Sequence, residues 1–366
     1  MRIGLLRFKY DFTGGAERSL FLLAQGLLAR GHQVEVVTTR WEGQAPAGLG
    51  LHLTPVRARG KGARLEAWAR ESRAAMARLG VDTFLSLDRV PGSPLFRAGD
   101  GCHAAWLAHR APYESTVKRL SFRFNPLHRT YLDLERRTLE HPDLRRVIAG
   151  SRLVARELQT YYQVPAAKLA VIYNGVDQMA LARAREPQTR QTARAQLQLA
   201  DQAPCLLFLG SGFERKGLAF ALAALAHLPE AILLVAGKGR TGPYARQARR
   251  LDLTERVRFL GPTNQVVELL AAADALVLPT MYDPCSNACL EALAAGLPVV
   301  TTRANGASEL VEEGVSGQVV ADPAQAGELA EACARALGLA RGFAHQVPDL
   351  AGWLSAVLAL VEGSRA

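Results

Sequence analysis

Short apolar runs alternate with amphipathic stretches along most of the chain, which has 366 residues. Residues 2–8 predict a buried strand, and residues 16–30 have the apolar face of a helix that Gly31 ends. In the second half, apolar runs that begin at Cys205 and Ala231 predict two more buried strands. Strands that alternate with helices in this way build βαβ units and parallel sheets. The pattern therefore predicts the α/β class.

The length of the chain predicts two domains. With 366 residues, of which 49% are apolar, it exceeds what one hydrophobic core usually supports. We place the boundary near residues 164–177, with an N-terminal domain over residues 1–170 and a C-terminal domain over residues 171–348. Residues 349–366 predict a final helix that packs across the domain junction.

The cysteines indicate a reducing compartment. There are five, they are scattered, and no apolar secretory leader precedes them, which favours the cytoplasm. Cys285 and Cys289 could suggest a metal site, but no second pair or histidine cluster completes it. We therefore interpret both as small packing residues.

The charge is concentrated in the first half of the chain. Residues 1–175 hold 27 Lys or Arg against 15 Asp or Glu, a balance of +12, whereas residues 176–366 hold 17 against 19, a balance of −2. Residues 104–137 interleave aromatic and basic side chains, which suits an anionic membrane surface. The alternative is a mixed helix that packs on its own domain with snorkelling arginines. Nucleic acid is disfavoured because no nucleic-acid module accompanies the charge.

A helix start with two nearby carboxylates is the most informative motif. Ser286 is a good N-cap, a short helix runs from Asn287, and Gly296 ends it. The free amides of such a helix start suit an anion. Glu291 lies one turn after Asn287, where its carboxylate could accept hydrogen bonds from a vicinal diol such as ribose. Asp283, in the preceding loop, would suit sugar hydroxyls; the plain alternative is a solvated helix carboxylate and an ordinary turn residue.

A glycine-rich loop with two cations follows the apolar run at Cys205. Gly212 admits a phosphate close to the backbone, and Arg215 and Lys216 would neutralise it. The alternative is a surface pair at a helix start, but the helix dipole disfavours cations there. The motif therefore indicates an anionic ligand such as a diphosphate, whose charge grows as it departs.

A rival motif would indicate a dinucleotide-dependent oxidoreductase. Gly237, Gly239 and Gly242 match Gly-x-Gly-x-x-Gly after a predicted strand. The match is weak because Pro243 follows directly, the motif lies in the second half of the chain, and no acidic residue stands at the required offset.

The chain resembles the retaining glycosyltransferases of family 4, which have the GT-B fold of two Rossmann-like domains facing a central cleft. Their pattern is Glu, seven residues and a second Glu, then Ala-x-x-x-Gly-x-Pro-Val-Val; Asp283 and Glu291 occupy the two acidic positions. The first carboxylate is thus one methylene shorter than in the family. Residues 151–158 and 171–177 match the family's usual passage between its domains.

The N-terminal half narrows the resemblance to lipopolysaccharide inner-core glucosyltransferases of the WaaG type. Residues 9–18, residues 41–43, and Pro91-Gly92 ahead of Asp100 carry it. Arg18 matches and is a candidate acceptor contact, but Ser19 stands where the pattern has Asp. The resemblance implies a peripheral enzyme at the inner face of the cytoplasmic membrane that moves a hexose, glucose by expectation, from a UDP-sugar to a lipid-linked core sugar with retention. Another glycolipid or exopolysaccharide, or a catalytically silent nucleotide-sugar binder, stays open.

Motifs and resemblance together assign the candidate residues. For catalysis they are Arg215, Lys216, Asp283, Glu291, Asp100 and His103. For binding the donor they are Gly14, Gly15, Gly212, Gly237, Gly261, Pro262, Asn287, Ala288 and Cys289. Asp100 and His103 would meet the acceptor hydroxyl or the sugar, unless they form only a polar loop. Because no apolar strand ends in Asp-x-Asp, we expect no metal and no cofactor, so cationic side chains and helix dipoles would stabilise the leaving diphosphate.

Overall fold

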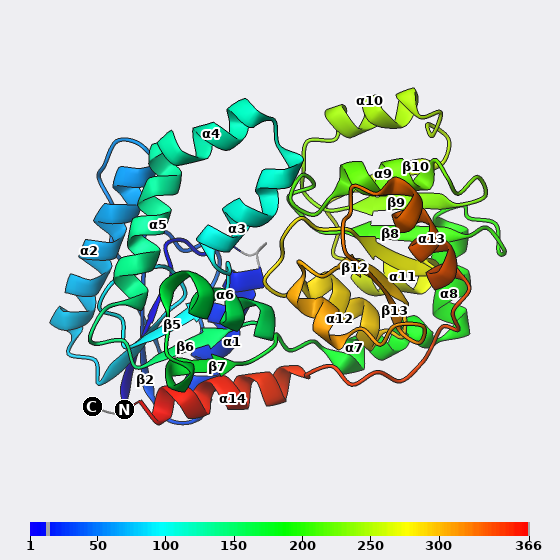
Figure 1. The fold of residues 1–366 in the computed structure, drawn as a ribbon. Coiled ribbons are helices and arrows are strands. Elements are labelled where there is room, and N and C mark those ends of the chain that lie inside the picture. The colour runs from blue at the N-terminus through cyan, green and yellow to red at the C-terminus, as the bar shows by residue number, and fades with distance from the viewer. Residues whose placement is uncertain (12–14, 365–366) are drawn as a thin grey trace. The chain divides into compact units, whose positions relative to one another are not determined.

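The computed structural model describes residues 1–11 and 15–364. The chain divides into two compact units, which are shown in Figure 1. The first comprises residues 1–173 and 351–366, and the second comprises residues 174–350.

The first unit contains a parallel sheet of seven strands among its described residues, in the order β3-β2-β1-β4-β5-β6-β7. The strands are β1 Arg2–Leu6, β2 Gln33–Thr38, β3 Leu49–Leu53, β4 Thr83–Ser86, β5 Leu95–Ala98, β6 Arg146–Ala149 and β7 Leu169–Val171. The helices are α1 Gly15–Ala29, α2 Lys61–Leu79, α3 His103–Arg110, α4 Thr116–Phe124, α5 Pro126–Leu139, α6 Arg152–Tyr162 and α14 Leu350–Glu362, with 3₁₀ turns η1 Ala111–Tyr113 and η2 Ala166–Lys168.

Helices cover both faces of this sheet, which explains why its strands are apolar on both sides. On β1, Ile3 and Leu5 belong to the core that includes residues of α1, whereas Leu6 belongs to the cluster with Trp68 and Met76 of α2. Successive side chains of a strand point to opposite faces, so this alternation follows from strand geometry. In register, Ile3 lies between Val34 of β2 and Thr83 of β4.

The last helix, α14, packs on the core of the first unit (red in Figure 1). Trp353, Val357, Leu358 and Val361 are buried there with residues of α1 and β1. Glu362 near its end pairs with two residues that follow α1, Arg30 at 3.1 Å and His32 at 2.9 Å. Helix α14 lies within residues 349–366, the segment for which the sequence predicted a final helix.

The second unit contains a parallel sheet of six strands among its described residues, in the order β10-β9-β8-β11-β12-β13. The strands are β8 Cys205–Leu209, β9 Ile232–Ala236, β10 Val257–Gly261, β11 Ala275–Leu278, β12 Val299–Thr302 and β13 Gly317–Val320. The helices are α7 Gln178–Ala182, α8 Pro187–Gln196, α9 Leu218–Leu225, α10 Gly242–Arg250, α11 Val266–Ala272, α12 Asn287–Ala294 and α13 Ala326–Leu337, with η3 Arg183–Arg185 and η4 Gly306–Leu310.

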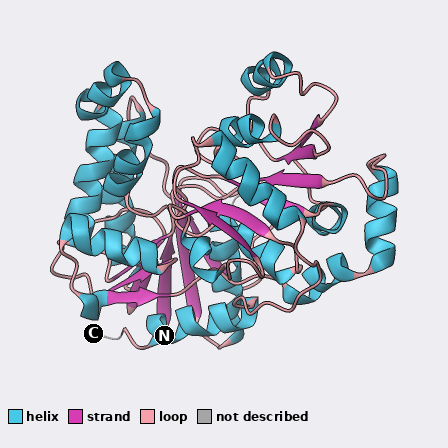
Figure 2. Cartoon of the chain, turned by 45° about the vertical axis from the view of Figure 1, so that its right-hand side comes forward, coloured by secondary structure: helices cyan, strands magenta, loops and turns pink. Residues whose placement is uncertain are grey.

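Strands β8, β11 and β12 are buried along their whole length, as the central strands of a parallel sheet are. Figure 2 shows helices on both sides of each sheet. The predicted α/β class with two parallel-sheet units is confirmed. In each sheet the strand order reverses beside its first strand, β1 or β8, and ligands of open α/β sheets bind beyond the carboxyl ends of the strands at such a point.

Candidate active site

Two cations and one carboxylate meet where β8 and β11 end. Arg215 donates from Nη1 to Oδ2 of Asp283 at 3.0 Å and to the carbonyl of Tyr282 at 2.8 Å. Lys216 donates from Nζ to the same Oδ2 at 3.0 Å. The structure therefore brings the three residues together, although Asp283 lies 68 positions after Arg215 and 67 positions after Lys216 in the sequence. Their formal charges leave one net positive charge in the cluster.

Glycines make room for this cluster. Gly210 has φ 145°, and a Cβ there would lie 2.7 Å from Cδ of Lys216. Gly217 has φ 80°, and a Cβ there would lie 1.9 Å from the carbonyl oxygen of Pro279. Both backbone conformations favour glycine, so the loop can bring Lys216 to Asp283. Gly212, with φ 79°, has open space where a Cβ would stand.

The burial of the cluster argues against the alternative in which these residues are a surface cation pair and an ordinary turn residue. Asp283 is 5% exposed and Lys216 is 8% exposed, so neither is an ordinary surface residue. Burial acts to raise the pKa of Asp283, but the charges and hydrogen bonds of Lys216 and Arg215 outweigh it and hold that pKa below its ordinary value. Asp283 is therefore an anion that fixes the two cations. The side chain of Arg215 is 36% exposed and is the part of the cluster that a ligand can reach.

Helix α12 begins beside this cluster. Ser286 is its N-cap as predicted, but its hydroxyl makes no capping bond to the helix and lies 3.4 Å from Nζ of Lys216. Sequence reasoning missed Asn305, which follows β12: its Oδ1 accepts from the backbone amide of Ser286 at 3.2 Å. Asn305 also pairs with Asp283 in an isolated parallel bridge. A polar residue three positions after a buried strand was the signal that could have found it.

The remaining residues of α12 have distinct surroundings. Asn287 accepts at Oδ1 from Nδ2 of Asn174 at 2.7 Å, a second asparagine that sequence reasoning missed. Ala288 and Cys289 are buried, and burial raises the pKa of the Cys289 thiol to about 11, so it stays a neutral packing group. Glu291 lies one turn after Asn287 and is half-buried.

Packing explains the glycines of the rival motif. Gly237 has φ 136°, and a Cβ there would lie 2.1 Å from the carbonyl oxygen of Gly210. A Cβ on Gly239 would lie 2.4 Å from the ring of Phe213. The motif follows β9 rather than β8, the first strand of this sheet. Gly261 ends β10 and its carbonyl accepts from the amide of Gly237 at 2.8 Å, and Pro262 beside it is exposed.

In the first unit, Glu135 of α5 organises the loop that carries Asp100 and His103. Its carboxylate is fully buried and accepts from the amide of His103 at 2.9 and 3.0 Å, at the start of α3. Arg89 donates to Glu135 at 2.8 Å and to the carbonyl of Gly101 at 3.0 Å. Asp100 itself is exposed after β5. Sequence reasoning missed Glu135 because it lies 32 residues beyond the amide that it holds.

His103 is held in a neutral form. Its Nε2 lies 3.1 Å from Nδ1 of His128, and its ring lies 4.8 Å from that of Tyr131. Burial, the charge of Arg89 and the neighbouring His128 together lower the pKa of His103 to about 3. At neutral pH the ring therefore acts as a polar hydrogen-bonding group and carries no charge.

Two further predicted residues, Gly15 and Arg18, belong to α1. Gly14 lies outside the described residues. Gly15 is the first residue of α1, and Arg18 is exposed on that helix. Within residues 1–11 and 15–364, no group of three His, Cys, Asp or Glu side chains is placed to hold a metal ion.

The chain matches known proteins over most of its length. The model of glycosyltransferase family 4 matches residues 13–178, and that of glycosyl transferases group 1 matches residues 203–338. The chain is 29% identical over 345 residues to the lipopolysaccharide glucosyltransferase WaaG of Escherichia coli K12, which covers 92% of this chain and 90% of WaaG. The chain belongs to glycosyltransferase family 4.

Solved structures agree with this assignment. The crystal structure of WaaG, a glycosyltransferase involved in lipopolysaccharide biosynthesis, aligns with a TM-score of 0.80 at 26% identity and covers 98% of this chain and 95% of that one. Anabaena HepE in complex with UDP and glucose aligns with a TM-score of 0.71 at 22% identity over 99% of both chains and shows the shared fold. This glycosyltransferase is therefore of the WaaG type with the GT-B fold, and the oxidoreductase interpretation is wrong.

Proposed function

We propose that this glycosyltransferase moves glucose from UDP-glucose to a lipopolysaccharide inner-core sugar and retains the anomeric configuration. The observation that carries the donor half is the cluster of Arg215 and Lys216 on Asp283, at the carboxyl ends of β8 and β11. The similarity to the lipopolysaccharide glucosyltransferase WaaG over 92% of this chain supports the acceptor half.

The donor diphosphate would meet positive groups that are already in place. Lys216 is fixed by Asp283 and Ser286, and Arg215 extends its exposed guanidinium from the same carboxylate. Preorganised cations stabilise charge that develops on a leaving group without reorganising during the reaction. The amides at the start of α12 add the positive end of the helix dipole. Glu291, one turn further, would accept from the ribose hydroxyls.

Attack would occur on the face from which the diphosphate leaves, with the donor phosphate as base. Asp100 and the neutral His103 would orient the acceptor hydroxyl or the hexose by hydrogen bonds. No side chain is assigned as a nucleophile, so an active Asp100→Asn variant is compatible with this mechanism.

The donor can be identified by comparing UDP-, ADP- and GDP-glucose with the purified protein. We expect UDP-glucose to raise Tm most and to be hydrolysed slowly without acceptor, because only a transferase activates the glycosidic bond. Glu291→Gln should weaken UDP-glucose binding by about tenfold, since it loses a charge-assisted hydrogen bond to ribose. Tm shifts and released glucose measure the two effects.

Binding without hydrolysis would support the silent nucleotide-sugar binder instead. Transfer to other acceptors but not to truncated core lipopolysaccharide would contradict the proposed acceptor.

Helix α4 supports a contact with an anionic membrane surface. Val117, Leu120 and Phe124 are 80%, 54% and 76% exposed, and their spacing of three and four residues places them on one side of the helix. Three cations of the same helix are Lys118, Arg119 and Arg123. Apolar side chains that insert and cations that meet lipid phosphates together bind such surfaces. Helix α5, by contrast, buries Leu134, Glu135, Thr138 and Leu139, so only part of the 104–137 segment is available. Among the described residues, no helix is both long and apolar enough to span a bilayer.

Phe124→Glu tests this contact. We expect binding to vesicles containing phosphatidylglycerol to fall by at least about tenfold, because the inserted ring is replaced by a charge that anionic lipid repels. Co-sedimentation with vesicles measures it, and high salt should weaken the wild-type protein in the same assay. Met179→Glu is the matched control, since Met179 is 87% exposed in the second unit. Equal losses in both variants, or none in either, would contradict a role for α4.

A further inference from the structure

Helix α10 of the second unit and the loop that leads into it from β9 carry a dense group of cations (α10 is labelled in Figure 1). We call residues 238–250 the α10 segment. It contains no Asp or Glu, and all of its cationic residues are exposed. These residues are Lys238, Arg240, Arg246, Arg249 and Arg250.

The rest of the second unit has the opposite charge. Residues 174–350 hold 16 Lys or Arg against 18 Asp or Glu, a balance of −2. Without the α10 segment, 11 Lys or Arg stand against the same 18 acids, a balance of −7. The unit is therefore an acidic body with one compact basic stretch. An anionic partner would be repelled by most of the unit and attracted at the α10 segment.

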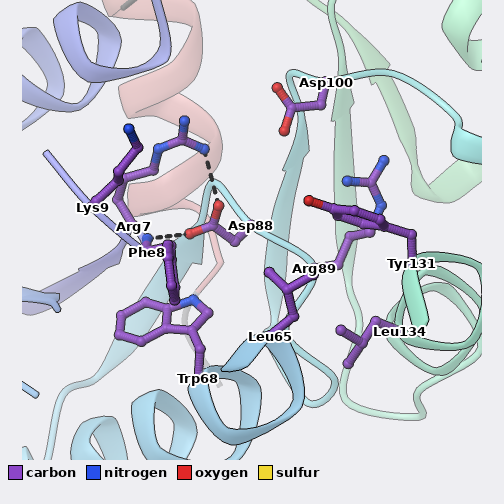
Figure 3. A pocket seen from close by; sticks show the side chains of 10 residues that line it. All are labelled: Arg7, Phe8, Lys9, Leu65, Trp68, Asp88, Arg89, Asp100, Tyr131 and Leu134. Atoms are coloured by element: carbon purple, nitrogen blue, oxygen red, sulfur yellow. Dashed lines mark hydrogen bonds and ion pairs between the residues drawn. The ribbon is translucent and has the colours of Figure 1, made fainter. Parts of the chain in front are cut away.

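The cations of the α10 segment have no carboxylate partner in the part of the chain that the structure describes. Other cations of the chain are paired. In the first-unit pocket of Figure 3, Arg7 pairs with Asp88 at 3.0 Å. Arg89, which lines the same pocket, pairs with Glu135 at 2.8 Å. Since the α10 cations make no such pair, they can turn toward an anion without first leaving a carboxylate.

One side of α10 is packed against its own unit. Ala248 is buried, and the ring of Tyr244, one turn earlier, lies 5.8 Å from the ring of Phe213. The exposed side carries three cations at a spacing of three and four residues, Arg246, Arg249 and Arg250. The packing therefore fixes which side of the helix presents the positive charge.

The helix dipole explains only part of this arrangement. Arg249 and Arg250 lie in the last turn of α10, where the dipole favours cations. Lys238 and Arg240, however, precede the helix, where the dipole disfavours them. The first turn also holds no acid, although an acid would be favoured there. A partner outside the unit accounts for cations at both ends of the helix.

The side chains of the segment favour a lipid surface over a protein. Among the described residues, none of the large apolar side chains that are exposed belongs to the α10 segment. The buried core of a protein interface is apolar and aromatic, so the segment lacks the groups that would anchor a protein. Anionic lipid headgroups, by contrast, attract each nearby Lys or Arg and need no matching shape.

We propose that the α10 segment binds the phosphates of anionic lipids by charge alone, without insertion. The choice of a lipid rests on the proposed function, in which the acceptor is lipid-linked. The surface itself goes beyond that function, because α4 belongs to the first unit and would insert apolar side chains. Two linked contacts bind more strongly than either contact alone, so loss of the α10 contact should weaken the whole chain.

The double variant Arg246→Gln, Arg250→Gln in the full chain tests this surface. We expect binding to vesicles of phosphatidylcholine and phosphatidylglycerol in equal amounts to fall at least about tenfold, because two cations that attract anionic lipid are lost. Co-sedimentation at low salt measures the loss. The difference from the wild-type protein should disappear at high salt, since the contact depends on charge alone.

The matched control removes the same charge elsewhere in the second unit. Arg183→Gln with Arg335→Gln changes two exposed cations outside the α10 segment and should leave vesicle binding unchanged. The α10 variant should also keep the wild-type KM for UDP-glucose with a detergent-dispersed acceptor, because the contact acts on docking and not on the donor.

Three outcomes would overturn the proposal: vesicle binding by the α10 variant that equals the wild type, an equal loss in the control variant, or tighter binding of a duplex oligonucleotide than of the vesicles at the same salt. A raised KM for UDP-glucose with vesicle binding intact would also overturn it and assign the cations to the donor. Hydrolysis of UDP-glucose is measured on the same samples. If the wild-type protein shows none, while its vesicle binding depends on the α10 segment, the surface is supported and only the transferase proposal fails.

Discussion

Replacing Lys216 by alanine is expected to lower turnover about a hundredfold, since removal of one preorganised donor to a developing anion raises the barrier by about 3 kcal/mol. Lys216 is suited to this role because its ammonium is buried and fixed by Asp283 and Ser286. The effect should fall on kcat rather than on KM, because the diphosphate gains charge only as it leaves. Steady-state transfer from UDP-glucose to a core acceptor measures both constants.

Arg249→Ala is the matched control for this variant. Arg249 is an exposed cation in the last turn of α10 in the second unit, so its loss changes the net charge equally without touching the cluster. Its kcat should equal that of the wild-type protein. A folded Lys216→Ala variant that retains the wild-type kcat would remove the cluster from the mechanism.

Replacing Asp283 by asparagine is expected to lower the free energy of unfolding of the second unit by about 3 kcal/mol. The substitution leaves the buried ammonium of Lys216 without its carboxylate, and breaking one partner of a buried ion pair typically costs 3–5 kcal/mol. We expect a value near the lower end of this range, because the side chain of Arg215 is 36% exposed and solvent screens its charge. Urea unfolding followed by circular dichroism measures the change. Asp201→Asn, at an exposed carboxylate of the same unit, should shift it by less than about 0.5 kcal/mol.

The pKa of Asp283 also predicts how the difference in unfolding free energy between the wild-type protein and Asp283→Asn depends on pH. The pKa of Asp283 is lowered from its ordinary value of 3.8 in the folded protein, so the ionised form is favoured by folding. Its contribution to stability is therefore fully present above about pH 4 and is lost as the pH falls below 3.8 toward the folded pKa. The wild-type protein and Asp283→Asn should thus converge in unfolding free energy in acid. A difference that stays constant from pH 7 to below pH 4 would show that the charge of Asp283 is not the cause.

Much of the fold follows from local patterns. The predicted helix at residues 16–30 is α1, Gly15–Ala29, and Gly31 has φ 79° where the helix ends. The run at Cys205 is β8, and the helix predicted from Asn287 is α12. Such patterns are readable because strand and helix periodicities depend on neighbouring residues. The candidate donor residues could be grouped before any coordinates only through their motifs and the resemblance to family 4, because the sheet order alone shows that β8 and β11 are neighbours.

Pairings across long sequence distances were not readable in the same way. Arg215 and Lys216 were chosen for a phosphate and Asp283 for sugar hydroxyls, yet in the fold all three share one ion-paired cluster. Glu135 had no motif of its own, and it becomes important only because α5 places it under the start of α3. Charge type was visible in the sequence, but the partner of each charge depends on packing.

By itself, the sequence determined the α/β class, the succession of strands and helices, the glycines that permit positive φ, and the resemblance to family 4, because each depends on residues close together in the chain. The tertiary structure decided which charges neutralise one another and which side chains are buried. The physical reason is that burial and pairing set the energy of a charge, and both arise only when distant segments pack.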